Sequence, residues 1–229
     1  MTRLLVSVRD VAEAQRAAAH GADLVDCKEP RAGALGALPV ETIAAVVRAV
    51  RALGPGRWLS ATVGDFAPDA IAPVLERVTA VAATGVDYVK VGLAPGAFEL
   101  LDALSESEAA IVPVFIADDG LDWALIERAR AARFPALMLD TAGKNAGSLF
   151  ERVDTGALRR FVHGARAAGC LSGLAGALRL EQAARVAAFG ADFAGFRTAA
   201  CTGGRTGTLD AARVRRLAEA LRGETAAAA

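Results

Sequence analysis

The chain has 229 residues, of which 54% are hydrophobic and 23% are charged, and its 26 basic side chains balance its 26 acidic ones. This hydrophobic fraction excludes an intrinsically disordered chain, and the neutral balance excludes a polycation that coats nucleic acid. We therefore expect a globular protein that has no nucleic-acid partner.

Eight short apolar segments alternate along the chain with longer segments of helical period. The predicted strands are Leu4–Val8, Leu24–Lys28, Leu59–Val63, Tyr88–Leu93, Ile111–Ile116, Leu137–Asp140, Leu171–Ala175 and Phe193–Arg197. The predicted helices are Val11–His20, Val40–Leu53, Pro68–Thr84, Ala97–Ser105, Leu121–Ala132, Thr155–Ala168, Leu180–Phe189 and Ala211–Arg222. Eight strand–helix units predict an α/β fold, a single (β/α)8 TIM barrel over residues 1–223, with a flexible tail at 224–229. A six-unit doubly wound sheet is the alternative, and it would turn two apolar runs into loops.

Three triplets of glycine, alanine or valine, and aspartate precede predicted strands, at residues 21–23, 85–87 and 190–192. Each glycine stands where a helix commonly ends with a left-handed residue. Each aspartate begins a strand, at the barrel end that carries stability and not chemistry. We therefore expect Asp23, Asp87 and Asp192 to be structural.

The cysteines and histidines form no recognisable metal or disulfide pattern. Cys27, Cys170 and Cys201 include no C-x-x-C pair, and His20 and His163 lie on helices away from the strand ends. The apolar stretch in the first residues is too short for the core of a signal peptide or for a membrane span. The sequence therefore predicts a cytoplasmic protein without metal, cofactor or membrane partner, in which amines and carboxylates perform any acid–base chemistry.

The basic residues comprise 23 arginines and three lysines, Lys28, Lys90 and Lys144. A lysine can lose its proton and attack a carbonyl, whereas an arginine effectively cannot. Lys28 ends a predicted strand, Lys90 lies in a predicted strand toward its end, and Lys144 follows a predicted strand by a few residues. In this fold the strand ends line the face where chemistry occurs. Three ammonium groups at one barrel mouth would lower one another's pKa and would attract a phosphorylated substrate.

Two of these lysines follow a carboxylate closely. Asp26 and Lys28 are two residues apart on one strand, so their side chains project to the same side, and Asp140 precedes Lys144 by four residues. Such a pair can move protons as a carbinolamine forms and dehydrates. The alternative for each pair is an ion pair that fixes a loop. Two such pairs with Lys90 at one mouth favour function.

Glycine-rich loops follow the seventh and eighth predicted strands, where this fold usually binds phosphate. Gly176 and Ala177 lie in the first loop, and Gly203 and Gly204 lie in the second. Arg197, at the end of the eighth strand, could add a bidentate contact to the phosphate. The alternative is that these glycines only permit turns.

Further polar and small residues surround the same end of the barrel. The loop 29–37 follows Lys28 and is either a lid or an ordered turn. Asp65, Asp118 and Asp119 follow the third and fifth strands and are reserve acid–base or polar contacts.

The chain resembles the (5-formylfuran-3-yl)methyl phosphate synthase family over nearly its whole length. The resemblance rests on Leu-Val-Ser-Val-Arg-Asp-Val-Ala-Glu-Ala near the start, Gly-Ala-Asp-Leu-Val-Asp-Cys-Lys-Glu-Pro, Ser-Ala-Thr-Val-Gly-Asp, Tyr-Val-Lys-Val-Gly-Leu, Met-Leu-Asp-Thr-Ala-Gly-Lys and Ala-Ala-Cys-Thr-Gly-Gly, in this order. It implies a barrel enzyme of methanofuran biosynthesis that condenses two molecules of glyceraldehyde 3-phosphate, with loss of phosphate and water, into a phosphorylated furan aldehyde.

The resemblance also implies a role for each matching residue. Lys28 corresponds to the family's Schiff-base lysine and Lys90 to its proton-accepting lysine. Asp140 and Lys144 correspond to the acid–base pair after the sixth strand, and Asp26 to the carboxylate of the second strand. The chain departs from the family's pattern at residues 145–146, Asn-Ala in place of Asp-Gly, and at Thr198 and Thr202, where the family has glycine and lysine.

Two other functions remain open from the residues. One is an aldolase-like or isomerase barrel for triose or pentose phosphates, in which an isomerase would use the lysines only as electrostatic clamps. The other is a barrel that binds a phosphorylated metabolite without turnover. The alanine-rich helices also lead us to expect a homo-oligomer.

Overall fold

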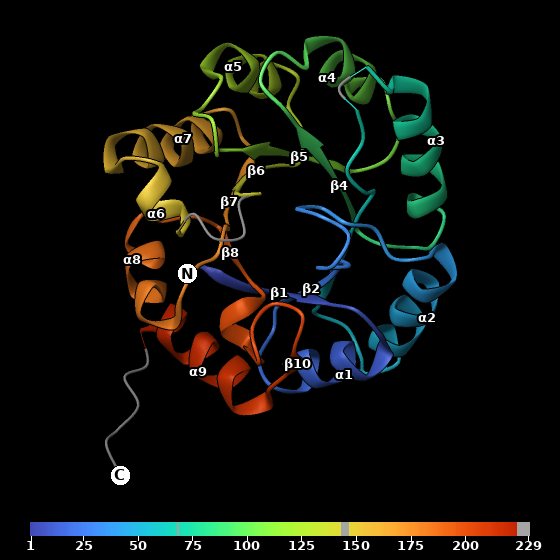
Figure 1. The fold of residues 1–229 in the computed structure, drawn as a ribbon, viewed down its shortest axis with the longest axis vertical. Coiled ribbons are helices and arrows are strands. Elements are labelled where there is room, and N and C mark those ends of the chain that lie inside the picture. The colour runs from blue at the N-terminus through green and yellow to red at the C-terminus, as the bar shows by residue number, and fades with distance from the viewer. Residues whose placement is uncertain (68, 143–146, 224–229) are drawn as a thin grey trace.

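Eight parallel strands close into a barrel in sequence order, and the helices lie outside it (Figure 1). The computed structural model describes residues 1–67, 69–142 and 147–223. The strands are β1 (Arg3–Val8), β2 (Leu24–Cys27), β3 (Trp58–Thr62), β4 (Tyr88–Leu93), β5 (Ile111–Ile116), β6 (Ala136–Asp140), β7 (Leu171–Leu174) and β8 (Phe193–Phe196). Arg3 of β1 is in register with Phe193 of β8, so the barrel is closed and the open six-stranded alternative is wrong.

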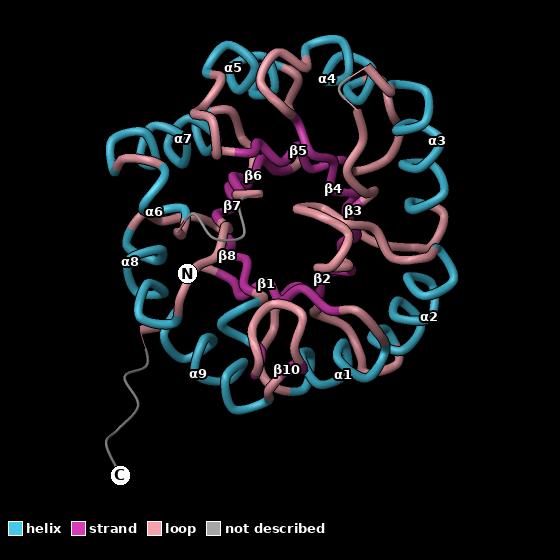
Figure 2. The backbone as a smooth tube through the Cα atoms, viewed as in Figure 1, coloured by secondary structure: helices cyan, strands magenta, loops and turns pink. Residues whose placement is uncertain are grey.

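The helices form a ring around the strands (Figure 2). They are α1 (Val11–Ala19), α2 (Val40–Arg51), α3 (Ile71–Ala82), α4 (Phe98–Ser105), α5 (Trp123–Ala131), α6 (Leu149–Arg152), α7 (Thr155–Ala167), α8 (Ala183–Ala188) and α9 (Ala211–Arg222). Two 3-10 turns, η1 (Leu180–Gln182) and η2 (Thr198–Ala200), and a small antiparallel pair, β9 (Cys201–Thr202) with β10 (Thr208–Leu209), complete the described chain.

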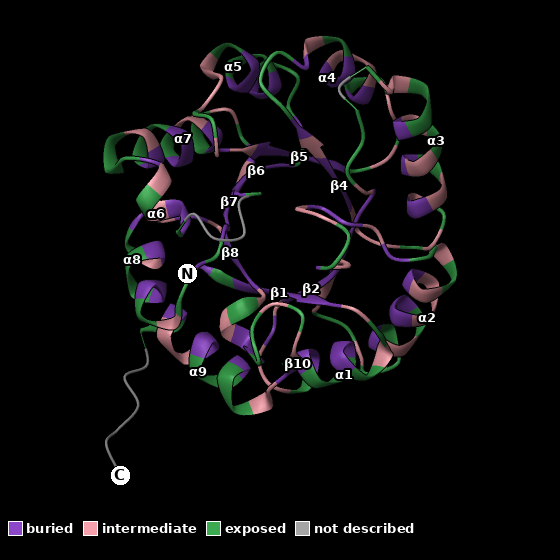
Figure 3. Ribbon diagram, viewed as in Figure 1, coloured by how far each residue is buried: buried purple, intermediate pink, exposed green. Residues whose placement is uncertain are grey.

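The barrel strands are mostly buried (Figure 3), and the side chains that alternate along them divide the core into two parts. Val25 and Cys27 of β2 pack with the helices, whereas Leu24 packs with the residues that fill the barrel. Side chains two apart on a strand project to the same side. Asp26 therefore points into the barrel between Leu24 and Lys28, and the same parity places Lys90 and Asp140 inside.

The three aspartates that begin strands are structural, as predicted. The carboxylates of Asp23, Asp87 and Asp192 each accept a backbone N–H from the preceding strand, from Leu4, Leu59 and Ser172 at 2.7–2.8 Å. The glycines two residues earlier have positive φ angles, 108° at Gly21, 86° at Gly85 and 72° at Gly190. Each triplet therefore ends one helix and joins the next strand to its neighbour.

Helix α6, the turn η2 and the β9–β10 hairpin were not predicted from the sequence. The short helix α6 begins after Ser148, whose N–H is accepted by the Glu151 carboxylate in a capping box. The β9–β10 hairpin occupies the segment predicted as a glycine-rich loop. Helix α3 begins at Ile71, later than predicted, and the predicted tail at 224–229 lies outside the described residues.

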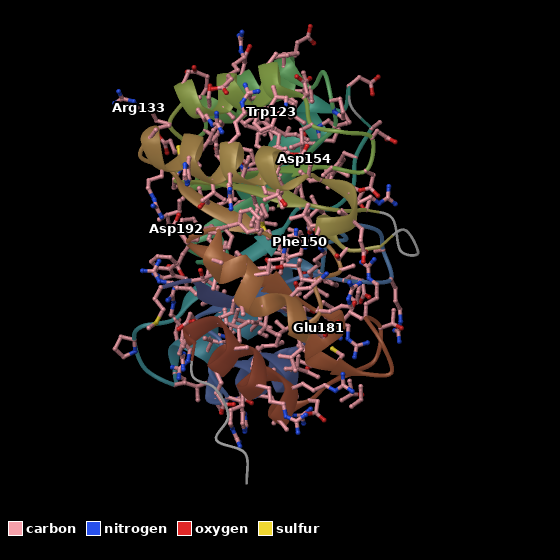
Figure 4. The ribbon with its side chains drawn as sticks, turned by 90° about the vertical axis from the view of Figure 1, so that its left-hand side faces the viewer. Trp123, Arg133, Phe150, Asp154, Glu181 and Asp192 are labelled. Carbon is pink, nitrogen blue, oxygen red and sulfur yellow. The ribbon has the colours of Figure 1, made fainter. Side chains whose placement is uncertain are left out.

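Aromatic side chains on the outer surface are covered by arginines. The guanidinium of Arg160 lies 3.9 Å from the ring centre of Trp123, and that of Arg185 lies 4.2 Å from the ring centre of Phe150. Figure 4 labels both aromatic residues on this side of the molecule. Because a cation over an aromatic face is attracted by the ring, these contacts shield apolar surface from water. No helix in the described ranges is long and apolar enough to cross a membrane.

Candidate active site

A pocket opens at the carboxyl end of the barrel and holds about 750 Å³ of empty space, its open mouth included. It brings together residues of β1, β4, β6 and β8 and of the loops after β2, β6, β7 and β8. Six predicted site residues line it, Lys28, Lys90, Asp140, Gly176, Ala177 and Arg197. Asp26 lies beneath the pocket wall, Gly203 and Gly204 are exposed outside the lining, and Lys144 lies outside the described residues.

Asp26 is the centre of a buried polar cluster. Its carboxylate is fully buried and accepts hydrogen bonds from Lys90 Nζ at 3.0 Å, Ser7 Oγ at 2.9 Å and Ser60 Oγ at 2.7 Å. Ser7 and Ser60 stand in register with Asp26 on the two neighbouring strands, which is why both hydroxyls reach it. Burial by itself would raise the pKa of Asp26, but the charges of Lys90 and Lys28 and the Ser60 hydrogen bond lower it below its ordinary value.

Lys28 forms a second ion pair at the pocket wall. Its Nζ lies 3.3 Å from Asp140 Oδ2, and the Asp140 Oδ1 accepts the N–H of Thr141 at 2.8 Å. The Lys28 side chain is 12% exposed and that of Lys90 is 3% exposed. Of the two lysines, Lys28 is therefore the one that a molecule in the pocket reaches first.

The ion pair of Asp26 has a different partner from the one that the sequence suggested, whereas the suggested pair of Asp140 and Lys144 falls outside the described residues. Asp26 was expected to act with Lys28 on its own strand, but its ion pair is with Lys90 on β4. Lys28 instead contacts Asp140 on β6, across the barrel. Both pairs cross the interior, so the two amines and the two carboxylates form one interior group and not two separate loop contacts.

Arg197 is bound entirely within the protein. Its five N–H groups donate to the carbonyls of Ser7, Arg205 and Gly207 and to both carboxylate oxygens of Glu13, at 2.6–3.2 Å. A guanidinium has five N–H donors, so none remains for a bidentate phosphate contact. In this structure Arg197 fixes the loop that follows β8.

Glu13 is the carboxylate at the centre of that arrangement, and it is buried. Burial alone would raise its pKa, but hydrogen bonds from Arg197 and Arg9 and the charge of Arg197 lower the pKa to about 2. Arg9 also donates to the carbonyls of Thr206 and Gly207. The helix α1 therefore positions the hairpin beside the mouth.

The loop after β7 has left-handed backbone at both residues predicted to bind phosphate. The φ angle is 108° at Gly176 and 44° at Ala177. A Cβ at position 176 would lie 2.7 Å from Thr141 Oγ1, so glycine is required both by the backbone and by the close approach of the β6 loop. The positive φ at Ala177 is uncommon for an alanine, and such strain concentrates at binding loops.

The loop 29–37 is an ordered turn that reaches over the centre of the ring (Figure 2). Its Leu35 is fully buried among the residues that fill the barrel, and the Leu35 N–H donates to the Asp65 carboxylate at 3.1 Å. Gly36 O accepts the Thr62 hydroxyl at 2.8 Å. Asp65 therefore anchors this loop, and Asp118 likewise binds the N–H of Ala142.

Sequence reasoning missed Ser7, Ser60 and Arg205. The serines could have been found, because each occupies an inward position on its strand between apolar neighbours. Arg205 also lines the pocket, and its position directly after Gly204, in the glycine-rich loop predicted to bind phosphate, is the signal that could have separated it from the other 22 arginines.

A closed barrel with lysine–carboxylate pairs in a pocket at its carboxyl end has the architecture of a barrel enzyme. The family model described as 4-HFC-P synthase matches residues 4–218, and the chain belongs to this family of enzymes. It is 40% identical to a Methylorubrum extorquens protein provisionally named (5-formylfuran-3-yl)methyl phosphate synthase, over 96% of this chain and 92% of that one. It is 37% identical to the (5-formylfuran-3-yl)methyl phosphate synthase of Methanopyrus kandleri, over 96% of this chain and 98% of that one.

Solved structures support the fold. Phosphoribosyl anthranilate isomerase from Thermotoga maritima superposes with a TM-score of 0.66 at 16% identity, over 97% of this chain and 100% of that one. A 3-hexulose-6-phosphate synthase superposes with a TM-score of 0.61 at 15% identity, over 96% of this chain and 100% of that one.

Proposed function

We propose that this chain condenses two molecules of glyceraldehyde 3-phosphate into (5-formylfuran-3-yl)methyl phosphate, for methanofuran biosynthesis, through a Schiff base on Lys28. The elements balance when one phosphate and two waters leave. Membership of the family supports the reaction, and the partly exposed Lys28 amine beside Asp140 is the observation that carries the mechanism.

Lys28 is the nucleophile in this scheme. Its Nζ passes a proton to Asp140 Oδ2, 3.3 Å away, and then attacks the carbonyl carbon of one triose phosphate, after that molecule's isomerisation to the ketone. Loss of water from the carbinolamine gives an iminium. The positive nitrogen makes the neighbouring C–H acidic, which is the purpose of the covalent bond.

Lys90 is the base that removes this α-proton. It lines the same pocket and is held by Asp26 at 3.0 Å, in a cluster that leaves its position little freedom. Once the Lys90 Nζ has released its proton to solvent in the pocket, the neutral amine can accept one from the substrate, while Asp26 stays ionised. The resulting enamine attacks the aldehyde carbon of the second triose phosphate and forms the new carbon–carbon bond.

The remaining steps are eliminations and a ring closure. Asp140 and Lys144 donate and accept the protons that accompany loss of phosphate and water. The contacts of Asp140 with Lys28 Nζ and the Thr141 N–H support this role, and the role of Lys144 comes from the family resemblance. Hydrolysis of the last iminium releases the product and frees Lys28.

Borohydride trapping tests the covalent step. When borohydride is added to the wild-type protein in the presence of glyceraldehyde 3-phosphate, the tryptic peptide that contains Lys28 should gain mass. Enzyme activity should fall in parallel. Lys28→Arg keeps the positive charge but cannot form the imine, so it should show no adduct and no furan absorbance. Lys90→Arg is the matched control, since it should lose turnover and still form an adduct at Lys28. Full activity of Lys28→Arg would refute the scheme, and an adduct confined to Lys90 would reverse the two roles.

A further inference from the structure

Four cationic side chains among the described residues line the pocket, and Arg205 differs from the other three. Each of the others has a carboxylate within 3.3 Å, Lys28 with Asp140, Lys90 with Asp26 and Arg197 with Glu13. Arg205 has no carboxylate partner among the described residues. A dianionic ligand in this pocket would therefore find one cation whose charge is not already matched by a neighbouring acid.

The Arg205 side chain is turned toward the mouth. It is half-buried, whereas the flanking Gly204 and Thr206 are exposed on the hairpin. Its Nη2 donates to the carbonyl of Gly33 in the loop 29–37, at 2.8 Å. Its own carbonyl accepts Arg197 Nε at 2.8 Å, so the backbone that carries the side chain is fixed.

We propose that Arg205 binds the phosphate of the substrate and links it to the loop that follows Lys28. One Nη2 hydrogen is engaged by Gly33, which leaves Nε, Nη1 and the second Nη2 hydrogen for phosphate oxygens. A planar guanidinium can serve two acceptors along different edges at once. The identity of the substrate rests on the proposed function, whereas the binding of a phosphate group does not.

The loop 29–37 is held by other contacts away from Gly33, so Arg205 acts on one side of the loop only. Leu35 is held in the barrel and by Asp65, and Glu29 N donates to Gly36 O at 2.8 Å. Gly33 lies at the side of the loop that meets the hairpin. A phosphate on Arg205 would hold the guanidinium in place and so strengthen its existing hydrogen bond to Gly33, which would further stabilise the loop 29–37 beside the Lys28 amine.

Inorganic phosphate is the probe for this site, since it requires no turnover. Calorimetric titration at constant ionic strength should show phosphate binding about 10- to 100-fold weaker in Arg205→Met than in wild type, as expected for loss of a charge-assisted hydrogen-bonding group. Arg205→Lys should recover part of the affinity because it keeps the charge. Arg48→Met, which removes an exposed arginine on α2, is the control and should bind as wild type does.

Hydrogen exchange of the peptide 29–38 tests the link. Phosphate should slow exchange there in wild type and in Arg48→Met. It should not do so in Arg205→Lys at saturating phosphate, because one ammonium lacks the fixed fork that serves Gly33 and an anion together. If Arg205→Met fails to fold, phosphate affinity and hydrogen exchange are both measured with Arg205→Lys.

The outcomes separate the two proposals. Phosphate affinity in Arg205→Met within threefold of wild type, or no phosphate binding by wild type, overturns the role of Arg205. Unchanged exchange at 29–38 overturns the link. If the wild-type protein forms no borohydride adduct at Lys28, the proposed reaction is overturned. The conclusion from the phosphate titration is not affected by that result.

Discussion

Lys90 Nζ and Asp26 Oδ2 lie 3.0 Å apart in the barrel interior, where Asp26 is fully buried and the Lys90 side chain is 3% exposed. A buried pair contributes little net stability relative to apolar residues, but removal of one partner leaves an unmatched charge in a medium of low dielectric constant. The two residues therefore depend on each other for stability as well as for position.

The substitution Asp26→Asn removes the charge of the Asp26 side chain and keeps its shape, so it isolates the effect of the charge on stability and turnover. The asparagine can keep a hydrogen bond to Ser60, but Lys90 loses its counter-charge. We expect a loss of about 3–5 kcal/mol in the free energy of unfolding and a fall in turnover of about 100-fold or more, measured by urea denaturation and furan absorbance. Asp102→Asn, which breaks an exposed ion pair with Arg128, is the control and should change neither quantity appreciably.

The double variant Asp26→Asn/Lys90→Met removes both charges. Because neither charge is then left alone, its unfolding free energy should exceed that expected from the sum of the single changes by about 1 kcal/mol or more. Additive losses would mean that the two side chains stabilise the barrel independently. Activity should stay low in all three variants.

Glu13 predicts how the site region responds to acid. Its pKa is about 2, below the ordinary value of 4.5, so its contribution to stability is full above about pH 4.5 and is lost as the pH falls from there through 2. Glu13→Gln should lower the melting temperature at pH 7, and the gap to wild type should narrow at pH 3. A gap that does not depend on pH would contradict the assignment of charge to this carboxylate.

The close approach of Leu35 to Gly92 predicts that substitutions at these two positions partly compensate for each other's effect on stability. A Cβ at position 92 would lie 2.6 Å from Leu35 Cδ1, so Gly92→Ala should displace the Leu35 side chain and destabilise the protein. Leu35→Ala alone should cost about 2–5 kcal/mol, since the side chain is fully buried. The double variant should be more stable than the sum of the two predicts, measured by urea denaturation, because the added methyl occupies part of the vacated space.

Gly176→Ala tests the loop after β7. The backbone has φ 108° and the new Cβ would meet Thr141, so we expect a loss of about 1–3 kcal/mol and a raised KM for the phosphorylated substrate. Gly54→Ala is a matched control, because Gly54 has φ 104° with open space around it. It should show the backbone cost alone and leave KM unchanged. Equal effects at both positions would argue against a role of the Thr141 contact.

The sequence predicts the barrel and the face of each strand well, for one physical reason. Side chains alternate along a strand, so an apolar pattern with Asp26, Lys90 and Asp140 at inward positions already places these residues in the interior. The structural role of Asp23 could be predicted in the same way, from its position at a strand start.

Partners across the barrel could not be predicted, because alternation does not give the stagger between strands. Asp26 is in register with Ser60 of β3, whereas Lys90 is in register with Thr62, two residues further along β3 toward the mouth of the barrel. Only that offset brings Lys90 to Asp26 and leaves Lys28 for Asp140. The contacts of Arg197 were missed for a related reason, since Glu13 is 184 residues away in the sequence.

The Asp26 cluster also divides the barrel into halves with different tasks. Its donors come from β1, β3 and β4, so the whole cluster belongs to the first four strands, whereas the loops at Gly176 and Arg205 belong to the last four. Cutting the chain between α4 and β5 would give two fragments, one with Lys90 and Asp26, the other with the loops at Gly176 and Arg205. Lys28 and Asp140 would then meet only when the fragments reassemble, so the imine that we propose at Lys28 would report complementation of the two halves.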